Sequence, residues 1–351
     1  METTVRNSVR NWRAIVAPYE RARDGRAALQ LATTWTLLGL VFALGYLGIS
    51  RSAWLTLALA VPAGLLLVRA FIIMHDCAHG SFFSSRRLNG IVGWLSGVLT
   101  LTPFAQWRRD HAQHHASSGD LDRRGHGDVR TLTVREYNAR SRSARWRYRL
   151  MRHPAVLLGL GPLHLMLVQR IRPPRTALRD PQTRSVWSTN LGIACAALFV
   201  GETLGWPSLL LVYLPAIYLA AMVGIWLFYV QHQFENTYWV PHSKWDYLTA
   251  SIRGSSYLRL PYVLAWFTGD IGVHHVHHLS PRIPNYLLQR CHDENALFHD
   301  VTTITLRDSW QLFRLALWDE QRECLISFAA ATRASRSAAA GHQSDAERLL
   351  N

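Results

Sequence analysis

The chain has 351 residues, of which 49% are hydrophobic, and its formal net charge is +15. This length could make two soluble domains, but the hydrophobic residues gather in long uncharged blocks, which is typical of a membrane protein. Most basic residues are arginines beside these blocks, so the charge indicates membrane topology rather than nucleic-acid binding. The four cysteines form no CxxC pair, which excludes a zinc ribbon and gives no sign of a disulfide framework.

The chain begins with an arm followed by a predicted helical hairpin. Residues 1–27 are rich in arginine, whereas residues 28–49 and 54–73 are almost wholly apolar. About 20 residues make roughly 30 Å of helix, which is enough to cross a hydrocarbon core. The loop between the two blocks has few basic residues, so the positive-inside rule places the N-terminal arm in the cytoplasm. The first apolar run starts late and has the length of a span, so no cleavable signal peptide is expected.

Two histidine clusters then flank a shorter apolar segment. HDCAH at 75–79 follows the second span, and HAQHH at 111–115 follows residues 88–105. The spacings i, i+4 and i, i+3, i+4 place imidazoles on one face of an α-helix, where they can converge on one metal centre. Histidines that share a centre must lie on one side of the membrane. Residues 88–105 are therefore predicted to lie at the interface rather than to cross.

A second predicted hairpin, residues 185–204 and 207–230, follows an arginine-rich loop of residues 106–184. Within that loop, residues 154–168 are apolar but short, and the same parity argument predicts a second interfacial segment there. All clusters and both termini are placed in the cytoplasm by the positive-inside rule.

A third cluster, HHVHH at 274–278, repeats the i, i+3, i+4 spacing, and His232 stands alone after the fourth predicted span. Helix geometry alone permits His275 as a ligand in place of His274. The other histidines, His242, His292 and His299 among them, are scattered and are expected at the surface or the interface. Residues 331–351 are rich in Ala, Ser and Arg and are predicted to be a flexible tail.

These features predict an all-α integral membrane protein with a single domain over residues 28–330. It has four transmembrane helices in two hairpins, interfacial helices, and a cytoplasmic helical cap. We expect the cap to carry a histidine-ligated dimetal site.

Three motifs resemble the histidine boxes of membrane fatty acid desaturases, the acyl-lipid branch above all. They are HDCAHGSFF at 75–83, WRRDHAQHHASSGDLDRRGHGD at 107–128 and GDIGVHHVHHLSPRIPNY at 269–286. The likeness runs in order over most of residues 70–290. Ala78 stands where the family usually has glycine, and Asp270 where asparagine is frequent, but neither change removes a ligand. Ala78 could shift the substrate or the regioselectivity.

The resemblance implies an O2-dependent fatty acyl desaturase that introduces a cis double bond into a lipid-linked acyl chain. It implies two irons, which imidazoles can hold while leaving coordination positions open, although zinc and copper also accept imidazole and zinc can fill such a site in purified protein. The implied metal ligands are His75, His79, His111, His114, His115, His232, His274, His277 and His278. Cys77, between two of them, is interpreted as a packing residue.

Three acids neighbour these histidines in the sequence: Asp76, Asp110 and Glu235. Each could accept a hydrogen bond from the second ring nitrogen of a ligand and fix its orientation, or could be an ordinary acid on a helix surface. Arg123 and Arg124 precede a glycine-rich turn, where they could contact a lipid phosphate or an acidic electron donor, or simply be solvated.

Electrons are expected from a separate ferredoxin or cytochrome b5, because the chain shows no heme-binding HPGG segment, iron-sulfur cysteine set or dinucleotide fingerprint. The arginines of residues 108–152 offer charge for docking an acidic carrier. Two alternatives stay open: a histidine-box hydroxylase or ketolase acting on a lipid, and a polytopic metal transporter or receptor. The second is disfavoured because the clusters lie at the ends of spans rather than inside them.

Overall fold

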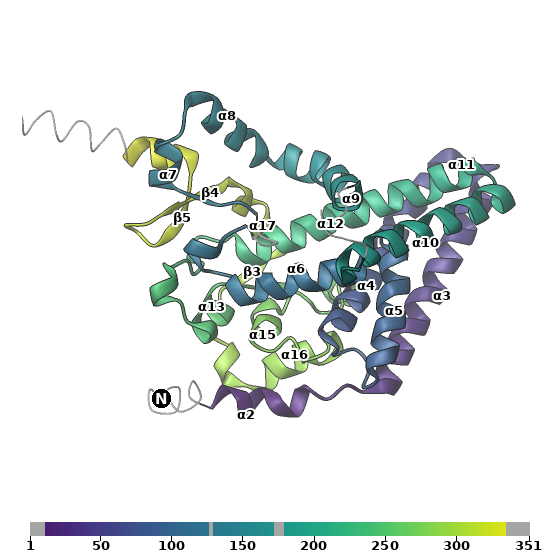
Figure 1. The fold of residues 1–351 in the computed structure, drawn as a ribbon, viewed down its shortest axis with the longest axis horizontal. Helices are drawn as coiled ribbons and strands as arrows, with labels where there is room; N and C mark the ends of the chain where they lie inside the picture. Colours follow the sequence, from purple (N-terminus) through teal and green to yellow (C-terminus); the bar gives the residue numbers. More distant parts are fainter. Residues whose placement is uncertain (1–10, 126–128, 172–178, 335–351) are drawn as a thin grey trace, which may run out of the picture.

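The computed structural model describes residues 11–125, 129–171 and 179–334. Long helices lie together on one side of the molecule, and short helices and strands form a cap on the other side (Figure 1). The helices contact each other along much of their length, and the histidine clusters lie where their ends meet the cap.

The first hairpin consists of α3 (Asp24–Ile49) and α4 (Ala53–His79), which pack against each other. Helix α4 continues beyond the apolar stretch predicted at 54–73 and includes the whole HDCAH motif. Gly80 ends the helix with a φ of 70°, a left-handed conformation that glycine adopts without steric cost. His75 and His79 therefore lie one turn apart at the end of a helix whose second half is mostly buried.

A sharp bend follows between α5 (Arg86–Leu99) and α6 (Phe104–Ser117), whose axes meet at 99°. The Thr102 N–H donates to the Gly97 carbonyl, and a Cβ at Gly97 would lie 2.6 Å from the Thr102 oxygen. This close approach lets the chain turn back, so that α6 returns to the end of α4. The location of residues 88–105 at a membrane interface stays a prediction.

The second hairpin begins with α10 (Pro181–Leu204) and returns through α11 (Trp206–Ser208), η4 (Leu209–Tyr213) and α12 (Leu214–His232). Residues 206–232 form one helix long and apolar enough to cross a membrane, as do α3 and α4. Helix α10 lies where a span was predicted but is not among these three, and the two bent helix pairs could each make one more span. The four-span topology therefore stays a prediction.

Helix α12 packs closely on α4 at Gly64. A Cβ at this position would lie 2.9 Å from the carbonyl oxygen of Ala216 and 3.0 Å from the Leu219 side chain. The absence of a side chain at Gly64 lets the two helix backbones approach, as small residues do at helix interfaces in membranes. This contact brings the end of α12, with His232, beside the end of α4.

The predicted interfacial segment 154–168 corresponds to η3 (Val156–Leu160) and the start of α9 (Gly161–Ile171). It follows α8 (Arg142–Met151) at a bend of 64°. Leu160, Leu163 and Leu167 are exposed along it, which suits contact with lipid.

The protein is mostly helical, as predicted, but the cap also contains two small sheets that the prediction did not include. In one sheet, β4 (Leu315–Asp319) pairs in parallel with β1 (Leu132–Thr133) and antiparallel with β5 (Cys324–Ser327). In the other, β2 (Tyr257–Arg259) pairs in parallel with β3 (Thr303–Thr305). Strands of two to five residues are too short to show an alternating pattern that sequence reasoning can detect.

Short helices complete the cap and present the third histidine cluster. They are α7 (Val134–Asn138), α13 (Tyr247–Arg253), α14 (Tyr262–Phe267), α15 (His274–Leu279), α16 (Asn285–Glu294) and α17 (Leu306–Ser309). The 3-10 helices are η2 (Leu121–Arg123), η5 (His242–Lys244), η6 (Ala296–Phe298) and η7 (Gln311–Arg314).

The N-terminal arm packs on the cap with α2 (Trp12–Val16) and η1 (Ala17–Tyr19). The Tyr19 hydroxyl donates to Glu294 (2.6 Å), and the Ser280 hydroxyl donates to Glu20 (2.7 Å). At the other end of the chain, residues 331–334 are helical and Ala331 is buried in a cluster with Tyr137 and Tyr148. The first four residues of the predicted tail thus belong to a helix, residues 335–351 lie outside the described residues, and the flexible tail stays a prediction.

Candidate metal centre

All nine histidines that the sequence singles out come together in two groups. The imidazole nitrogens within each group lie within 4.8 Å of one another. The first group is His75, His79, His111, His115 and His277, and the second is His114, His232, His274 and His278. Four helices supply them: α4, α6, α12 and α15.

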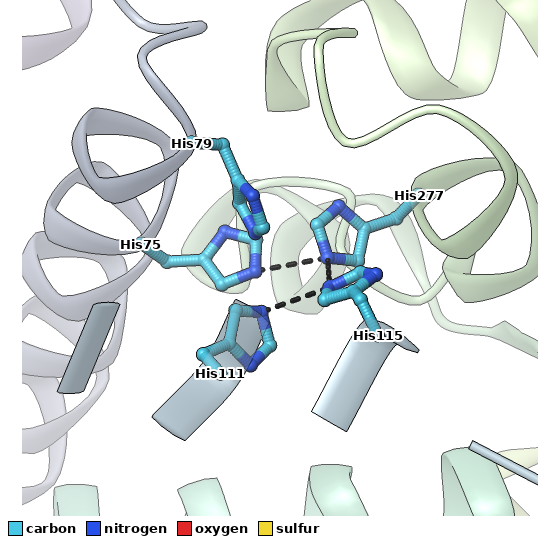
Figure 2. Close-up of side chains that lie close together, drawn as sticks. All are labelled: His75, His79, His111, His115 and His277. Atoms are coloured by element: carbon cyan, nitrogen blue, oxygen red, sulfur yellow. Dashed lines mark hydrogen bonds between the residues drawn. The ribbon is translucent and has the colours of Figure 1, made fainter. Parts of the chain in front are cut away.

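The first group is held between α4, α6 and α15 (Figure 2). His277 Nε2 lies 3.0 Å from His75 Nε2 and 3.0 Å from His115 Nε2. His115 Nε2 lies in turn 3.1 Å from His111 Nε2. Four ring nitrogens from three helices thus face a common point, and the ring of His79 lies above them in the same view.

The second group is centred on His232 at the end of α12. Its Nε2 atom lies 3.2 Å from His114 Nε2 and 3.0 Å from His274 Nε2. The two groups adjoin, because the rings of His115 and His278 stack with centroids 4.3 Å apart. The i, i+3, i+4 spacing on α6 and α15 distributes neighbouring residues of one helix to both groups.

These residues fit a metal centre on two observations. His79 Nε2 and His278 Nε2 are buried, and the described part of the chain gives neither a hydrogen-bond partner. A buried nitrogen without a partner costs about 1–3 kcal/mol, which coordination would offset. Moreover, two nitrogens bound about 2.1 Å from one ion at a right angle lie about 3 Å apart. The Nε2 separations of 3.0–3.2 Å match that distance.

The protonation state also suits metal binding. Burial, and then the neighbouring imidazoles of His75 and His115, lower the pKa of His277 well below its usual value. The imidazole is therefore neutral at physiological pH, as a histidine ligand must be.

Asp76 makes the contact that the sequence suggested for it. Its carboxylate accepts from His75 Nδ1 (2.9 Å), which leaves His75 Nε2 free to face the first group. The other carboxylate oxygen accepts from the backbone N–H (2.6 Å) and the side-chain amide (2.8 Å) of Asn285. Asn285 thus holds the carboxylate that orients His75.

Glu235 does not take this role. Glu235 is exposed, and the carbonyl of Gly254 accepts from His232 Nδ1 (3.2 Å) in its place. The hypothesis for Glu235 was wrong because the chain leaves the helical conformation directly after His232 and its side chain turns to the surface. Asp110 is exposed, one turn before His114 on α6, and its suggested role stays a prediction.

His274, rather than His275, belongs to the centre. His275 is fully buried on the other face of α15, where its Nε2 lies 3.1 Å from His292 Nδ1. His292 was expected at the surface but is buried, with the ring of Tyr257 4.6 Å away. The apolar face of α16, which includes Leu288 and Cys291, is the sequence signal that could have placed His292 inside.

Sequence reasoning also missed a contact of Trp107, the first residue of the second histidine motif. Its ring stacks on His111, with centroids 4.3 Å apart, and lies 5.6 Å from the ring of His75. Because Trp107 precedes His111 by four residues on α6, this contact follows from helix spacing alone.

Arg124 is engaged within the fold, because four of its five guanidinium N–H groups donate to protein oxygens. It forms a double ion pair with Glu136 (2.6 and 2.9 Å) and donates to the carbonyls of Leu121 and Thr131. Arg123 is more than half exposed and keeps one edge toward His242 (3.1 Å). Of the two arginines, Arg123 is the more accessible.

Long apolar helices beside nine clustered imidazoles, seven of them buried and two half-buried, define a polytopic membrane protein with a candidate two-metal centre. The sequence model of the fatty acid desaturase family matches residues 52–305, which is most of the chain. The protein belongs to the fatty acid desaturase family and is an oxidoreductase.

Named relatives agree with this assignment. The chain is 42% identical over 330 residues to a fatty acid desaturase of Bacillus subtilis, covering 94% of this chain and 93% of the relative. It is 26% identical to the sn-1 oleoyl-lipid 12-desaturase of Synechocystis, covering 77% and 76% of the two chains. It is 28% identical to the sn-1 acyl-lipid omega-3 desaturase (ferredoxin) of Synechocystis, covering 73% and 71%.

Proposed function

We propose that this protein is an O2-dependent desaturase that introduces a cis double bond into the acyl chain of a membrane lipid. The observation that carries the proposal is the meeting of nine imidazoles in two adjoining buried groups, in a chain of the desaturase family. In the overall reaction, O2, two electrons and two protons are consumed with two hydrogens of the acyl chain, and two waters form.

The nine histidines would hold two irons, one for each group. Iron supplies the oxidising power that removal of hydrogen from an unactivated methylene requires, and histidine ligands leave positions open for O2. Asp76 fixes the tautomer and the ring orientation of His75, and the Gly254 carbonyl does the same for His232. Trp107 covers the first group on the α6 side and keeps water from His111.

The lipid-linked substrate is supported by the names of the two Synechocystis relatives, both of which are acyl-lipid desaturases. The exposed leucines along the helices of this chain suit a substrate that arrives from within the bilayer. We assign the centre and the termini to the cytoplasmic side, because the arginine-rich arm packs on the cap beside the histidines.

A separate electron donor, of the ferredoxin or cytochrome b5 type, completes the reaction. One relative is named as a ferredoxin-dependent enzyme. Arg108 and Arg109 are exposed on α6, within one turn of Trp107 and His111. An acidic donor docked on these arginines would lie close to the first histidine group, and its turnover would fall as ionic strength rises.

The test is expression in a host of defined membrane lipids, beside a His277→Ala variant and a His153→Ala control, in which an exposed histidine outside both groups is removed. Fatty acids with two hydrogens fewer should appear with the unmutated protein and the control, and not with His277→Ala. The purified unmutated protein and the control should also bind iron, and the purified His277→Ala protein should bind less. Products that gain one oxygen would identify a hydroxylase or ketolase instead, and identical lipids in all three cultures would overturn the proposal.

A further inference from the structure

A cavity of about 380 Å³ opens on the cap, away from the histidines. It lies between α7, α8 and the helical residues 331–334, and its walls include three arginines of α8: Arg142, Arg145 and Arg149. Their spacing of i, i+3, i+7 places the three guanidinium groups along one face of the helix.

The described part of the chain does not neutralise the positive charge of this cavity. Within the described ranges, no carboxylate lies within ion-pair distance of the three guanidinium groups. Carboxylates do pair with arginines nearby, since Glu136 forms an ion pair with Arg124 and Glu320 forms one with Arg135. Three unpaired arginines around one cavity therefore favour an anionic ligand.

Aromatic rings hold two of the arginines in place. The Arg149 Nε atom donates to the hydroxyl of buried Tyr137 (2.6 Å), and its guanidinium lies 5.0 Å from the Phe328 ring. The Arg145 guanidinium lies 6.0 Å from the Tyr137 ring. Their side chains are thus ordered before a ligand arrives, which lowers the entropic cost of binding.

The surroundings favour a lipid. Helix α8 exposes Trp146, Leu150 and Met151 beside the arginine face, and it leads through a 64° bend into a segment with exposed leucines. A helix with exposed apolar side chains next to arginines is typical of the membrane interface, where tryptophan and the phosphate groups of lipids lie at the same depth.

The same position disfavours an electron donor. In Figure 1, α8 lies at the top of the cap, whereas α15, which carries His274, His277 and His278, lies on the far side of α6. A carrier docked on α8 would be far from the centre it must reduce.

We propose that Arg142, Arg145 and Arg149 bind the phosphate group of an anionic membrane phospholipid in this cavity. Arginine forks match phosphate oxygens, and Trp146 with Leu150 would contact the upper part of the acyl chains. The lipid would hold α8, and with it the β1–β4–β5 side of the cap, at the membrane surface.

The test measures binding of dioctanoyl phosphatidylglycerol to the full chain in a non-ionic detergent. One variant combines Arg142→Gln, Arg145→Gln and Arg149→Gln. The matched control combines Arg147→Gln, Arg307→Gln and Arg314→Gln, which removes the same charge from exposed positions outside the cavity. Arg142→Gln alone, at an exposed residue, serves if the triple variant fails to fold.

Each basic residue near an anionic lipid contributes about a fivefold gain in affinity, so the cavity triple should lose about a hundredfold and Arg142→Gln about fivefold. The control triple should bind as the unmutated protein does. Equal affinities in the cavity variants and the unmutated protein, or an equal loss in the control, would overturn the proposal. Because the readout is lipid binding, it does not depend on the metal centre or on desaturase activity.

Two competitors separate the possible sources of the anion. Inorganic phosphate should displace the lipid only weakly, and displacement at equal concentration would assign the cavity to free phosphate. An acidic ferredoxin should not compete. If ferredoxin displaces the lipid, and the cavity triple abolishes ferredoxin binding, the cavity is a protein docking site and the lipid assignment fails.

Discussion

The carboxylate of Asp76 is buried between His75 and Asn285 and accepts three hydrogen bonds. Replacing it with Asn removes the charge that stabilises the Nδ1–H tautomer of His75. It can also place the new amide N–H group opposite the N–H donors of Asn285, where no hydrogen bond can form. We expect Asp76→Asn to lower iron affinity or activity by about 10–100-fold. Iron content and product yield of the purified variant measure this.

Glu235→Gln is the matched control for that experiment. Glu235 is exposed, and the carbonyl of Gly254, not Glu235, accepts the hydrogen bond from His232 Nδ1. It should retain full iron content. An Asp76→Asn protein with unchanged iron content and yield would show that Asp76 does not orient His75.

Burial of the charged Asp270 side chain destabilises the fold, whereas the backbone conformation at this position favours Asp or Asn. Its φ is +53°, a left-handed conformation that Asn and Asp adopt more readily than other residues with side chains. Burial raises the pKa of Asp270 from 3.8 to about 6, although the charge of Arg69 acts in the opposite direction. The folded protein therefore binds a proton that the unfolded chain releases between these values, and stability falls as pH rises from about 4 to about 6.

Asp270→Asn removes this penalty and keeps the left-handed conformation. We expect a gain of about 1–2 kcal/mol at pH 7.5 and almost none at about pH 3, where the acid is protonated in both states. Thermal unfolding of the detergent-solubilised protein across this pH range measures the difference, with Asp300→Asn as an exposed control. A gain independent of pH would contradict the assignment to charge burial.

At the scale of secondary-structure elements, the contact between α4 and α12 sets the position of His232 relative to His75. Gly64→Ala would place a Cβ 2.9 Å from the backbone oxygen of Ala216, which cannot move without shifting α12. We expect a loss of about 1–3 kcal/mol in stability and a weaker metal centre. Gly39→Ala in α3 meets nothing within 4 Å and should be neutral or stabilising by up to about 1 kcal/mol. Equal unfolding temperatures for both variants would contradict a close contact at Gly64.

Element boundaries could be predicted where the apolar pattern is long and could not where it is short. The apolar blocks located α3, α4, α10 and the helix of residues 206–232 to within a few residues. The strands of the cap escaped prediction because two to five residues carry too little pattern, and pairs such as β2 with β3 join segments far apart in the sequence.

At the scale of the whole molecule, the candidate centre joins α4, α6, α12 and α15, so bound metal should act as a cross-link between them. Removal of metal with a chelator should lower the unfolding temperature of the purified protein. Metal at about a hundred times its Kd stabilises the folded state by about 2.7 kcal/mol. The shift should be much smaller in His277→Ala, because His277 contributes to the first group. An equal shift in both proteins would place the metal elsewhere.

The sequence by itself determined the histidine clusters, their spacing on helices, the apolar helices and the family. These features are local, because periodicity along one segment fixes which side chains share a face. Only the tertiary structure decided which side chains meet across segments. It placed His274 rather than His275 in the centre and paired Arg124 with Glu136. It also showed that His232 Nδ1 donates to a backbone carbonyl instead of to Glu235. These contacts join residues that are far apart in the sequence. They depend on how helices and strands pack, which the local sequence pattern does not determine.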